Sequence, residues 1–294
     1  MKKLLITGAK GFVGRNLQES YLKDKYDITA IDYMDLDLTN TEAVDAWFKD
    51  KYFDGVINCA LKPGHRNVDD TSDFLACNFR IFENLARHSD KMGRFINMGS
   101  GSVYGQDINL SGVSEDFLFK HLGPSELSLY KYTVAKRAEA IPNFIDFFVF
   151  GIFGKYEDYA IRFISNAVCK AIFDLPITCR QNRLFSYLDV ADIAQFFDYF
   201  IENEPQHKAY NIVPDKVYGL VELAHMVREI SGKDIPIQVA QEGNGIDYYG
   251  SNTRVKVEVK DCHFTPMEES IKNLFAYYES IKGKINYESL LIDK

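Results

Sequence analysis

The sequence predicts an α/β fold, a doubly wound parallel sheet followed by a smaller C-terminal lobe. In the first half, short apolar runs rich in β-branched residues alternate with segments of helical spacing. The first run, Lys3–Thr7, leads straight into a glycine-rich segment that opens a helix. Strands separated by helix-length segments pair in parallel through right-handed crossovers, so these observations together favour a doubly wound sheet.

The expected elements divide the chain into two parts. Strands are predicted at Lys3–Thr7, Asp27–Ile31, 55–59, 94–98 and 145–150, and helices at 16–23, 41–51, 71–88 and 129–141. After residue 154 the pattern loosens into a segment at 159–171, a strand-like run at 175–178, and helices at 190–202 and Leu220–Ser231. We therefore interpret residues 1–154 as the sheet domain and 155–294 as a smaller lobe over its carboxyl edge, with segments that can return to the sheet.

Composition and charge exclude several classes of protein. With 46% hydrophobic and 26% charged residues, the 294-residue chain is of the ordinary globular type. A formal charge of -8 provides no basic surface for nucleic acid. Five scattered cysteines without Cys-x-x-Cys spacing favour a reducing compartment, and no metal site is expected. Because no apolar run is long enough for a signal peptide or a membrane span, we expect a cytoplasmic protein with no membrane partner.

A glycine-rich turn after the first predicted strand is interpreted as a dinucleotide site. Its glycines have Gly-x-x-Gly-x-x-Gly spacing, which permits a tight turn and the close approach of a pyrophosphate to the helix N-terminus. A lone glycine triplet more often marks a plain turn, but the position between strand and helix favours the nucleotide. The residues expected to contact the cofactor here are Gly8, Lys10, Gly11, Phe12, Val13 and Gly14.

Asp32, at the end of the second predicted strand, indicates NAD as the cofactor. A carboxylate at this position accepts a hydrogen bond from the ribose 2′-hydroxyl and repels a 2′-phosphate. Lys10 is placed where a cation could meet a 2′-phosphate, so NADP is kept as an alternative. The other interpretation of Asp32 is a solvated turn residue.

Tyr132 and Lys136 form the candidate catalytic pair. Four residues apart, they share one face of a predicted helix. A neighbouring ammonium lowers the pKa of a tyrosine and so prepares it for proton transfer, and the lysine can also hold the nicotinamide ribose. In a chain with 18 tyrosines, the alternative is an ordinary surface pair. The presence of Ser100 directly after the predicted strand at 94–98 favours the catalytic interpretation.

These motifs, in this order, resemble the extended short-chain dehydrogenases/reductases, the NAD-dependent epimerase/dehydratase family that modifies nucleotide sugars. The Ser-x-x-x-Tyr-Gly pattern at 100–105 is similar to the family's serine segment. The resemblance implies a Rossmann fold, a homodimer, and Ser100 as the group that polarises the substrate oxygen, with Ser102 as the alternative. It also implies cofactor contacts by Asp37, Leu38, Cys59, Ala60 and Asn78, for which capping of strand ends or helix backbone is the alternative.

Arg183 opens a segment, 183–194, that also resembles this family. The resemblance implies that Arg183 binds the substrate's diphosphate, a role suited to its planar fork of donors, with Arg180 and Arg254 as helpers. The alternative is a surface arginine paired with Asp189. The resemblance thus covers most of the chain.

The implied activity is hydride transfer at a carbon of a nucleotide-linked sugar, by a 4-keto reductase or a 4-epimerase. Sugar 4,6-dehydratases carry an Asp-Glu pair where Gly101 and Ser102 stand here, so dehydration is disfavoured. The family's arginine on the strand after the catalytic helix is missing as well, which leaves the nucleotide and sugar open. A non-catalytic NAD(P)-binding regulator or scaffold of the same fold is the alternative class.

Overall fold

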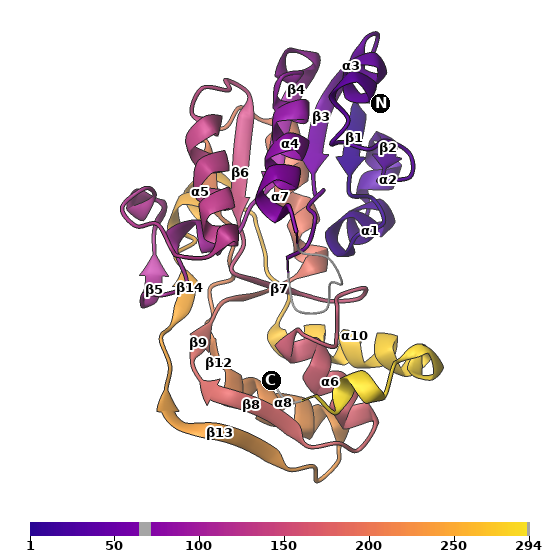
Figure 1. Cartoon of the computed structure of the whole chain (residues 1–294). Coiled ribbons are helices and arrows are strands. Elements are labelled where there is room, and N and C mark those ends of the chain that lie inside the picture. The colour runs from indigo at the N-terminus through magenta and orange to yellow at the C-terminus, as the bar shows by residue number, and fades with distance from the viewer. Residues whose placement is uncertain (65–71, 293–294) are drawn as a thin grey trace.

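The computed structural model describes residues 1–64 and 72–292, in which a parallel sheet with its helices adjoins a smaller lobe (Figure 1). Six strands form this sheet in the order β11-β6-β4-β3-β1-β2, and every neighbouring pair is parallel. The strands are β1 (Lys3–Thr7), β2 (Asp27–Ile31), β3 (Phe53–Asn58), β4 (Met92–Met98), β6 (Phe144–Phe148) and β11 (Ala209–Asn211). Order and direction confirm the predicted doubly wound fold.

Helices cover both faces of the sheet because successive strand residues point to opposite sides. Leu4 and Ile6 of β1 pack in one cluster with residues of two helices on the first face, whereas Leu5 packs with helices on the second face. The first face carries α1 (Phe12–Glu19) and α7 (Ile193–Glu202). The second carries α3 (Thr41–Phe48), α4 (Phe74–Ala86) and α5 (Glu126–Ala138).

The smaller lobe has its own apolar cluster. Its main elements are α6 (Phe163–Ile172), β8 (Ile177–Asn182), α8 (Leu220–Ser231), β13 (Ile237–Asn244) and α10 (Met267–Ser280). A separate sheet in the order β12-β9-β14-β5 joins this lobe to the region after β4. Its strands are β12 (Tyr218–Gly219), β9 (Leu184–Phe185), β14 (Tyr248–Gly250) and β5 (Leu110–Val113).

The chain crosses between the two parts more than once. Helix α7 and strand β11 lie after residue 154 in the sequence but are part of the sheet domain. Helix α7 packs on the first face of the large sheet, and β11 pairs with β6 in it. Short connecting elements are α2 (Leu22–Lys25), α9 (Thr253–Glu258), and β7 (Gly151–Phe153) paired with β10 (Tyr187–Asp189). Within the described residues, every helix is too short or too polar to span a bilayer.

Element boundaries differ from the prediction mainly at helix starts. The helix expected at 16–23 begins at Phe12, directly after the glycine turn, and ends at Glu19 before the separate α2. The helix expected at 129–141 begins at Glu126, because the Ser125 hydroxyl accepts a hydrogen bond from the Ser128 amide and caps it. Residue 71, where a helix was expected to begin, lies outside the described residues.

Candidate active site

The glycine turn after β1 brings backbone groups too close together for side chains. A β-carbon added at Gly8, which has φ of +66°, would stand 2.7 Å from the carbonyl carbon of Cys59. One added at Gly14 would stand 2.3 Å from the Gly8 oxygen. Helix α1 then begins at Phe12 without a side-chain cap and without an acidic residue in its first turn. Its first amides are therefore available to an anion such as a pyrophosphate.

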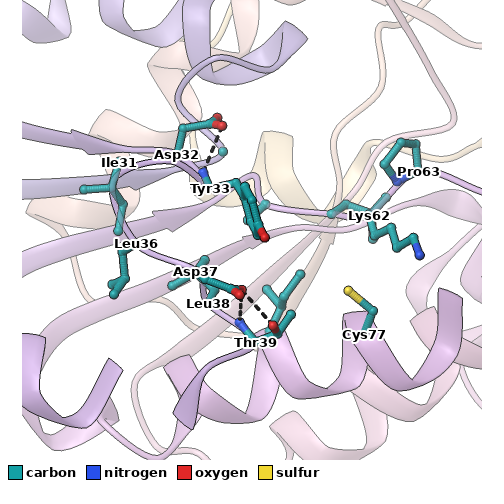
Figure 2. Close-up of a pocket in the computed structure, with 14 residues that line it drawn as sticks. Ile31, Asp32, Tyr33, Leu36, Asp37, Leu38, Thr39, Lys62, Pro63 and Cys77 are labelled. Carbon is teal, nitrogen blue, oxygen red and sulfur yellow. Dashed lines mark hydrogen bonds between the residues drawn. The ribbon is translucent and has the colours of Figure 1, made fainter. Parts of the chain in front are cut away.

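Beside this turn lies a pocket of about 500 Å³ at the carboxyl ends of β1, β2 and β3 (Figure 2). A pocket of this volume with apolar and acidic lining residues suits an adenosine. Its lining residues are Gly8, Ile31, Asp32, Tyr33, Leu36, Asp37, Leu38, Thr39, Ala60, Leu61, Lys62, Pro63, Cys77 and Ile81. Of the residues predicted to bind the cofactor, the pocket thus brings together Gly8, Asp32, Asp37, Leu38 and Ala60.

The two predicted acidic residues are held in place by backbone donors. The Asp32 carboxylate accepts hydrogen bonds from the Lys10 and Tyr33 amides, each at 2.9 Å, which ties the end of β2 to the glycine turn. Asp37 accepts from the amide and hydroxyl of Thr39, at 2.9 and 2.7 Å. Both residues line the pocket, and these hydrogen bonds fix the orientation of their carboxylates, as ribose recognition requires.

Asn78 and Cys59, also predicted to contact the cofactor, are not among the residues that line this pocket. The buried Asn78 amide accepts a hydrogen bond from the Lys62 amide at 2.8 Å and donates to the Lys62 carbonyl at 3.0 Å, so it fixes the loop after β3. Burial raises the pKa of Cys59 to about 12, which keeps its thiol neutral. All five cysteines are free thiols.

Ser100 caps a short turn immediately after β4. Its hydroxyl accepts a hydrogen bond from the Ser102 amide at 3.2 Å. The Ser102 hydroxyl is fully buried and, among the described residues, has no hydrogen-bond partner. A buried polar atom without a partner is costly unless a ligand satisfies it, which is consistent with a substrate at this end of β4.

Tyr132 and Lys136 lie together, but on the outer side of α5. The Tyr132 ring packs edge-on against Phe119 at 5.2 Å between centroids, and the Lys136 ammonium lies 4.4 Å from the same ring. Lys136 also pairs with Glu139 at 2.9 Å, and its side chain is 57% exposed. No hydrogen bond joins either residue to Ser100 in the described part of the chain. The catalytic role of this pair stays a prediction.

The half-buried Arg183, which lies between β8 and β9, packs near the buried Tyr248 of β14. The Arg183 guanidinium lies 4.8 Å from the Phe185 ring and 5.7 Å from the Tyr248 ring. Among the described residues, neither the Arg183 Nε nor the Tyr248 hydroxyl has a hydrogen-bond partner. Burial raises the pKa of Tyr248 to about 12, against opposing effects of Gln106, Ser100 and the Arg183 charge. The Gln106 and Ser100 side chains thus lie near enough to the Tyr248 hydroxyl to affect its pKa, although no hydrogen bond joins them in the described residues.

The predicted helpers of Arg183 lie elsewhere. Arg254 donates a hydrogen bond to Asp116 at 2.9 Å and to the Ala209 carbonyl at 3.2 Å. It lines a different pocket, together with Glu115 and Asp116. Arg180 is exposed on β8. The substrate-binding roles of both remain predictions.

Two residues near the site were missed in the sequence, Lys131 and Tyr248. Lys131 lies on the buried face of α5, and its ammonium donates to the Met98 carbonyl at 3.0 Å. The helical phase contained a signal for it, because Lys131 falls on one stripe with Val134 and Ala138. Tyr248 had no such signal, since its position depends on the pairing of β14 with distant strands.

The doubly wound sheet, the cramped glycine turn and the acidic pocket beside it define a protein that binds a nicotinamide dinucleotide. The model of the NAD dependent epimerase/dehydratase family matches residues 4–213, and the chain belongs to this family.

Relatives of this chain include enzymes named for nucleotide sugars. A GDP-L-fucose synthase of Azorhizobium caulinodans is 34% identical over 155 residues, 49% of this chain and 49% of that protein, so this match spans about half of each. A GDP-L-colitose synthase of Yersinia pseudotuberculosis is 25% identical over 78% of this chain and 82% of its own length. A GDP-mannoheptose C4 reductase from Campylobacter jejuni with NADP bound shares the fold, with a TM-score of 0.80 at 21% identity over 95% of this chain and 98% of that chain.

Proposed function

We propose that this protein is an NAD(P)-dependent oxidoreductase or epimerase that acts at a carbon of a nucleotide-linked sugar, with a GDP-linked 4-keto sugar as the first substrate to test. A bound nicotinamide supplies or accepts the hydride. The names of the relatives support the class of substrate, since three of them refer to GDP-linked sugars. The pocket beside the glycine turn supports a site for the adenosine of the cofactor, and the serine at the end of β4 supports a site for the reacting sugar.

The observation that carries the proposal is the state of Arg183. Its guanidinium is partly buried, its Nε has no hydrogen-bond partner, and no carboxylate of the described residues forms an ion pair with it. Burial lowers its pKa, against the smaller opposing effects of Tyr187, Tyr248 and the Asp247 charge, so desolvation of the guanidinium outweighs the charges around it. A diphosphate would satisfy the planar fork, and an arginine binds such a group with two parallel hydrogen bonds.

In this proposal each residue of the site has a separate role. Arg183 holds the diphosphate, Ser100 and Ser102 present hydroxyls to the reacting sugar oxygen, and a phenol transfers the proton that accompanies hydride movement. The phenol is Tyr132 in the sequence prediction, whereas the hydroxyl near Ser100 belongs to Tyr248. A homodimer is part of the proposal from resemblance alone.

The experiment follows nicotinamide absorbance with NADH or NADPH and with GDP-, UDP- or dTDP-linked 4-keto sugars. Loss of absorbance with one nucleotide series supports the reductase. Epimerisation of the corresponding 4-hydroxy sugar nucleotide with only a catalytic amount of NAD supports the epimerase. Arg183→Met is expected to raise KM about tenfold or more, because a charged hydrogen-bonded contact is lost. Arg228→Met is the control and should leave KM unchanged, because this half-buried arginine on α8 contacts His225 of its own helix.

The alternative function, cofactor binding without turnover, has one observation in its favour. Tyr132 and Lys136 have no contact with Ser100 in the described residues, and a chain that only binds the dinucleotide needs no such contact. Tight NADH binding with no conversion of any nucleotide-linked sugar would support this alternative and contradict the enzyme.

A further inference from the structure

A row of hydrogen-bonded polar side chains crosses the interior of the large sheet. The Thr7 hydroxyl donates to the Asn58 side-chain oxygen at 2.7 Å, the Asn58 amide donates to Asn97 at 2.8 Å, and the Asn97 amide donates to Asp146 at 2.9 Å. All four side chains are buried. We refer to Thr7, Asn58, Asn97 and Asp146 as the polar row.

The polar row follows one rung of the sheet. Thr7 pairs in register with Asn58, Asn58 with Asn97, and Asn97 with Asp146. Each of the first three residues lies at or next to the end of its strand, so the row runs just beneath the carboxyl edge. This edge is where ligands bind in open α/β sheets. Four buried polar residues on one rung replace apolar contacts that a purely structural sheet would use there.

The row ends at a charge that is incompletely satisfied. One oxygen of Asp146 accepts from Asn97, whereas the other, Oδ2, is buried with no hydrogen-bond partner among the described residues. The favourable charge interaction that Asp146 receives comes from Lys131 of α5. Asp146 in turn opposes the effect of burial, which lowers the pKa of Lys131.

Lys131 lies farther along the same edge than the adenosine pocket. The glycine turn contacts the backbone of Cys59 and Ala60, and the pocket wall includes Ala60 and Leu61. Cys59 and Asp146 are the charged or titratable groups that act on Lys131, and its ammonium reaches the last carbonyl of β4, that of Met98. A dinucleotide with its adenosine in the pocket and its pyrophosphate at α1 extends along this edge toward Ser100.

We propose that Lys131, and not Lys136, is the ammonium that positions the nicotinamide half of the cofactor, and that the polar row holds Lys131 in place through Asp146. A lysine has three donors, and hydroxyls of the second ribose are suited to the donors that remain beside the Met98 carbonyl. The exposed Lys136, already paired with Glu139, has no comparable place at the sheet edge. This inference depends on the cofactor site of the proposed function but not on the sugar.

The experiment compares binding of NADH and of AMP, measured by titration without any sugar. AMP fills the adenosine pocket but lacks the second ribose and the nicotinamide, so it reports whether the rest of the site is intact. Lys131→Met is expected to weaken NADH about tenfold or more, the effect of one charged hydrogen bond, while AMP binding changes less than about twofold. Lys136→Met tests the competing assignment from the sequence and should leave the binding of both ligands unchanged.

Asp146→Asn tests the polar row without a change of shape. It keeps an oxygen for the Asn97 donor but removes the charge beside Lys131, so NADH binding should weaken about three- to tenfold with AMP unaffected. Normal NADH binding by Lys131→Met would overturn the proposal. So would an equal loss of NADH and AMP, or a selective loss of NADH in Lys136→Met. If Lys131→Met fails to fold, the other two variants still test the proposal: Asp146→Asn should weaken NADH binding and Lys136→Met should not. Failure of the sugar assay with intact NADH binding would concern the proposed function alone.

Discussion

The Asp146 carboxylate lies so close to the backbone of Gly99 that a β-carbon added there would stand 2.3 Å from Oδ1. The same carbon would stand 2.7 Å from the Phe147 carbonyl oxygen. Gly99 connects β4 to the Ser100 turn. The buried acid therefore packs against the residue directly before the predicted active serine. The close approach requires glycine because one contact is with backbone and the other is with a buried carboxylate oxygen that Asn97 holds by a hydrogen bond.

Gly99→Ala should therefore destabilise the protein by about 1–3 kcal/mol, the usual range for an overpacked core. Gly283→Ala is the control, since nothing lies within 4 Å of its added carbon. Denaturant unfolding of both variants measures the difference. A Gly99→Ala protein as stable as Gly283→Ala would show that the Asp146 carboxylate is free to move away.

Cofactor preference should depend on Asp32. Because Asp32 lines the pocket and its carboxylate is fixed by the Lys10 amide, it should repel a 2′-phosphate bound there. Asp32→Asn keeps an oxygen for that amide and removes the charge, so NADPH affinity relative to NADH should rise about five- to tenfold. Fluorescence titration with both cofactors measures the ratio. Asp27→Asn, at the exposed opposite end of β2, should leave the ratio unchanged; an unchanged ratio in Asp32→Asn would contradict the assignment.

The sequence predicted the parts of this molecule that depend on local pattern. β1, β2 and α8 match residue for residue, and the glycine turn lies where strand and helix required it. Short apolar runs and glycine spacing are local signals, so no tertiary contact was needed to read them.

The candidate site was harder, because the tyrosine-lysine spacing did not determine which helix face is buried. Tyr132 and Lys136 have the expected spacing, yet the buried stripe of α5 includes Lys131 instead. The residue one turn before Lys131 is Leu127, which packs partly buried against the core rather than supplying a phenol. Tyr248 and Arg183 approach each other only through strand pairing between distant segments, which no local pattern encodes.

The pH dependence of stability should report the buried Asp146. Burial raises the pKa of its carboxyl to about 6, against the opposing effects of Lys131 and Asn97. Since the folded protein then holds this proton more tightly than the unfolded chain, Asp146 makes stability fall as the pH rises from about 4 to about 6. Asp146→Asn removes this contribution. The melting temperature of the variant relative to the parent should rise across that window and stay constant above it.

The comparison with Asp27→Asn, an exposed carboxylate, separates this effect from general changes in charge. In Lys131→Met the attraction that lowers the pKa of Asp146 is lost, so the window should extend above pH 6. A constant difference between Asp146→Asn and the parent from pH 4 to pH 7 would mean that the carboxyl is ionised throughout.

Two tyrosines compete for the role of proton donor, and their phenylalanine variants distinguish them. Tyr248→Phe removes a buried hydroxyl near Ser100 that has no hydrogen-bond partner in the described residues, so it should not lower stability. If this hydroxyl transfers the proton, kcat falls about 10²-fold or more with little change in KM. Tyr132→Phe removes a hydroxyl on the outer side of α5 and should change kcat less than about threefold, within the range of an indirect effect.

The two variants are matched, because each loses a single oxygen and keeps its ring packing, Tyr248 with Phe150 and Tyr132 with Phe119. Thermal unfolding of both establishes that any loss of activity is chemical. Loss of turnover in Tyr132→Phe with full activity in Tyr248→Phe would restore the helix pair as the catalytic one and would require α5 to rotate when substrate binds. Full activity in both variants would place the proton transfer on Ser100 or on solvent.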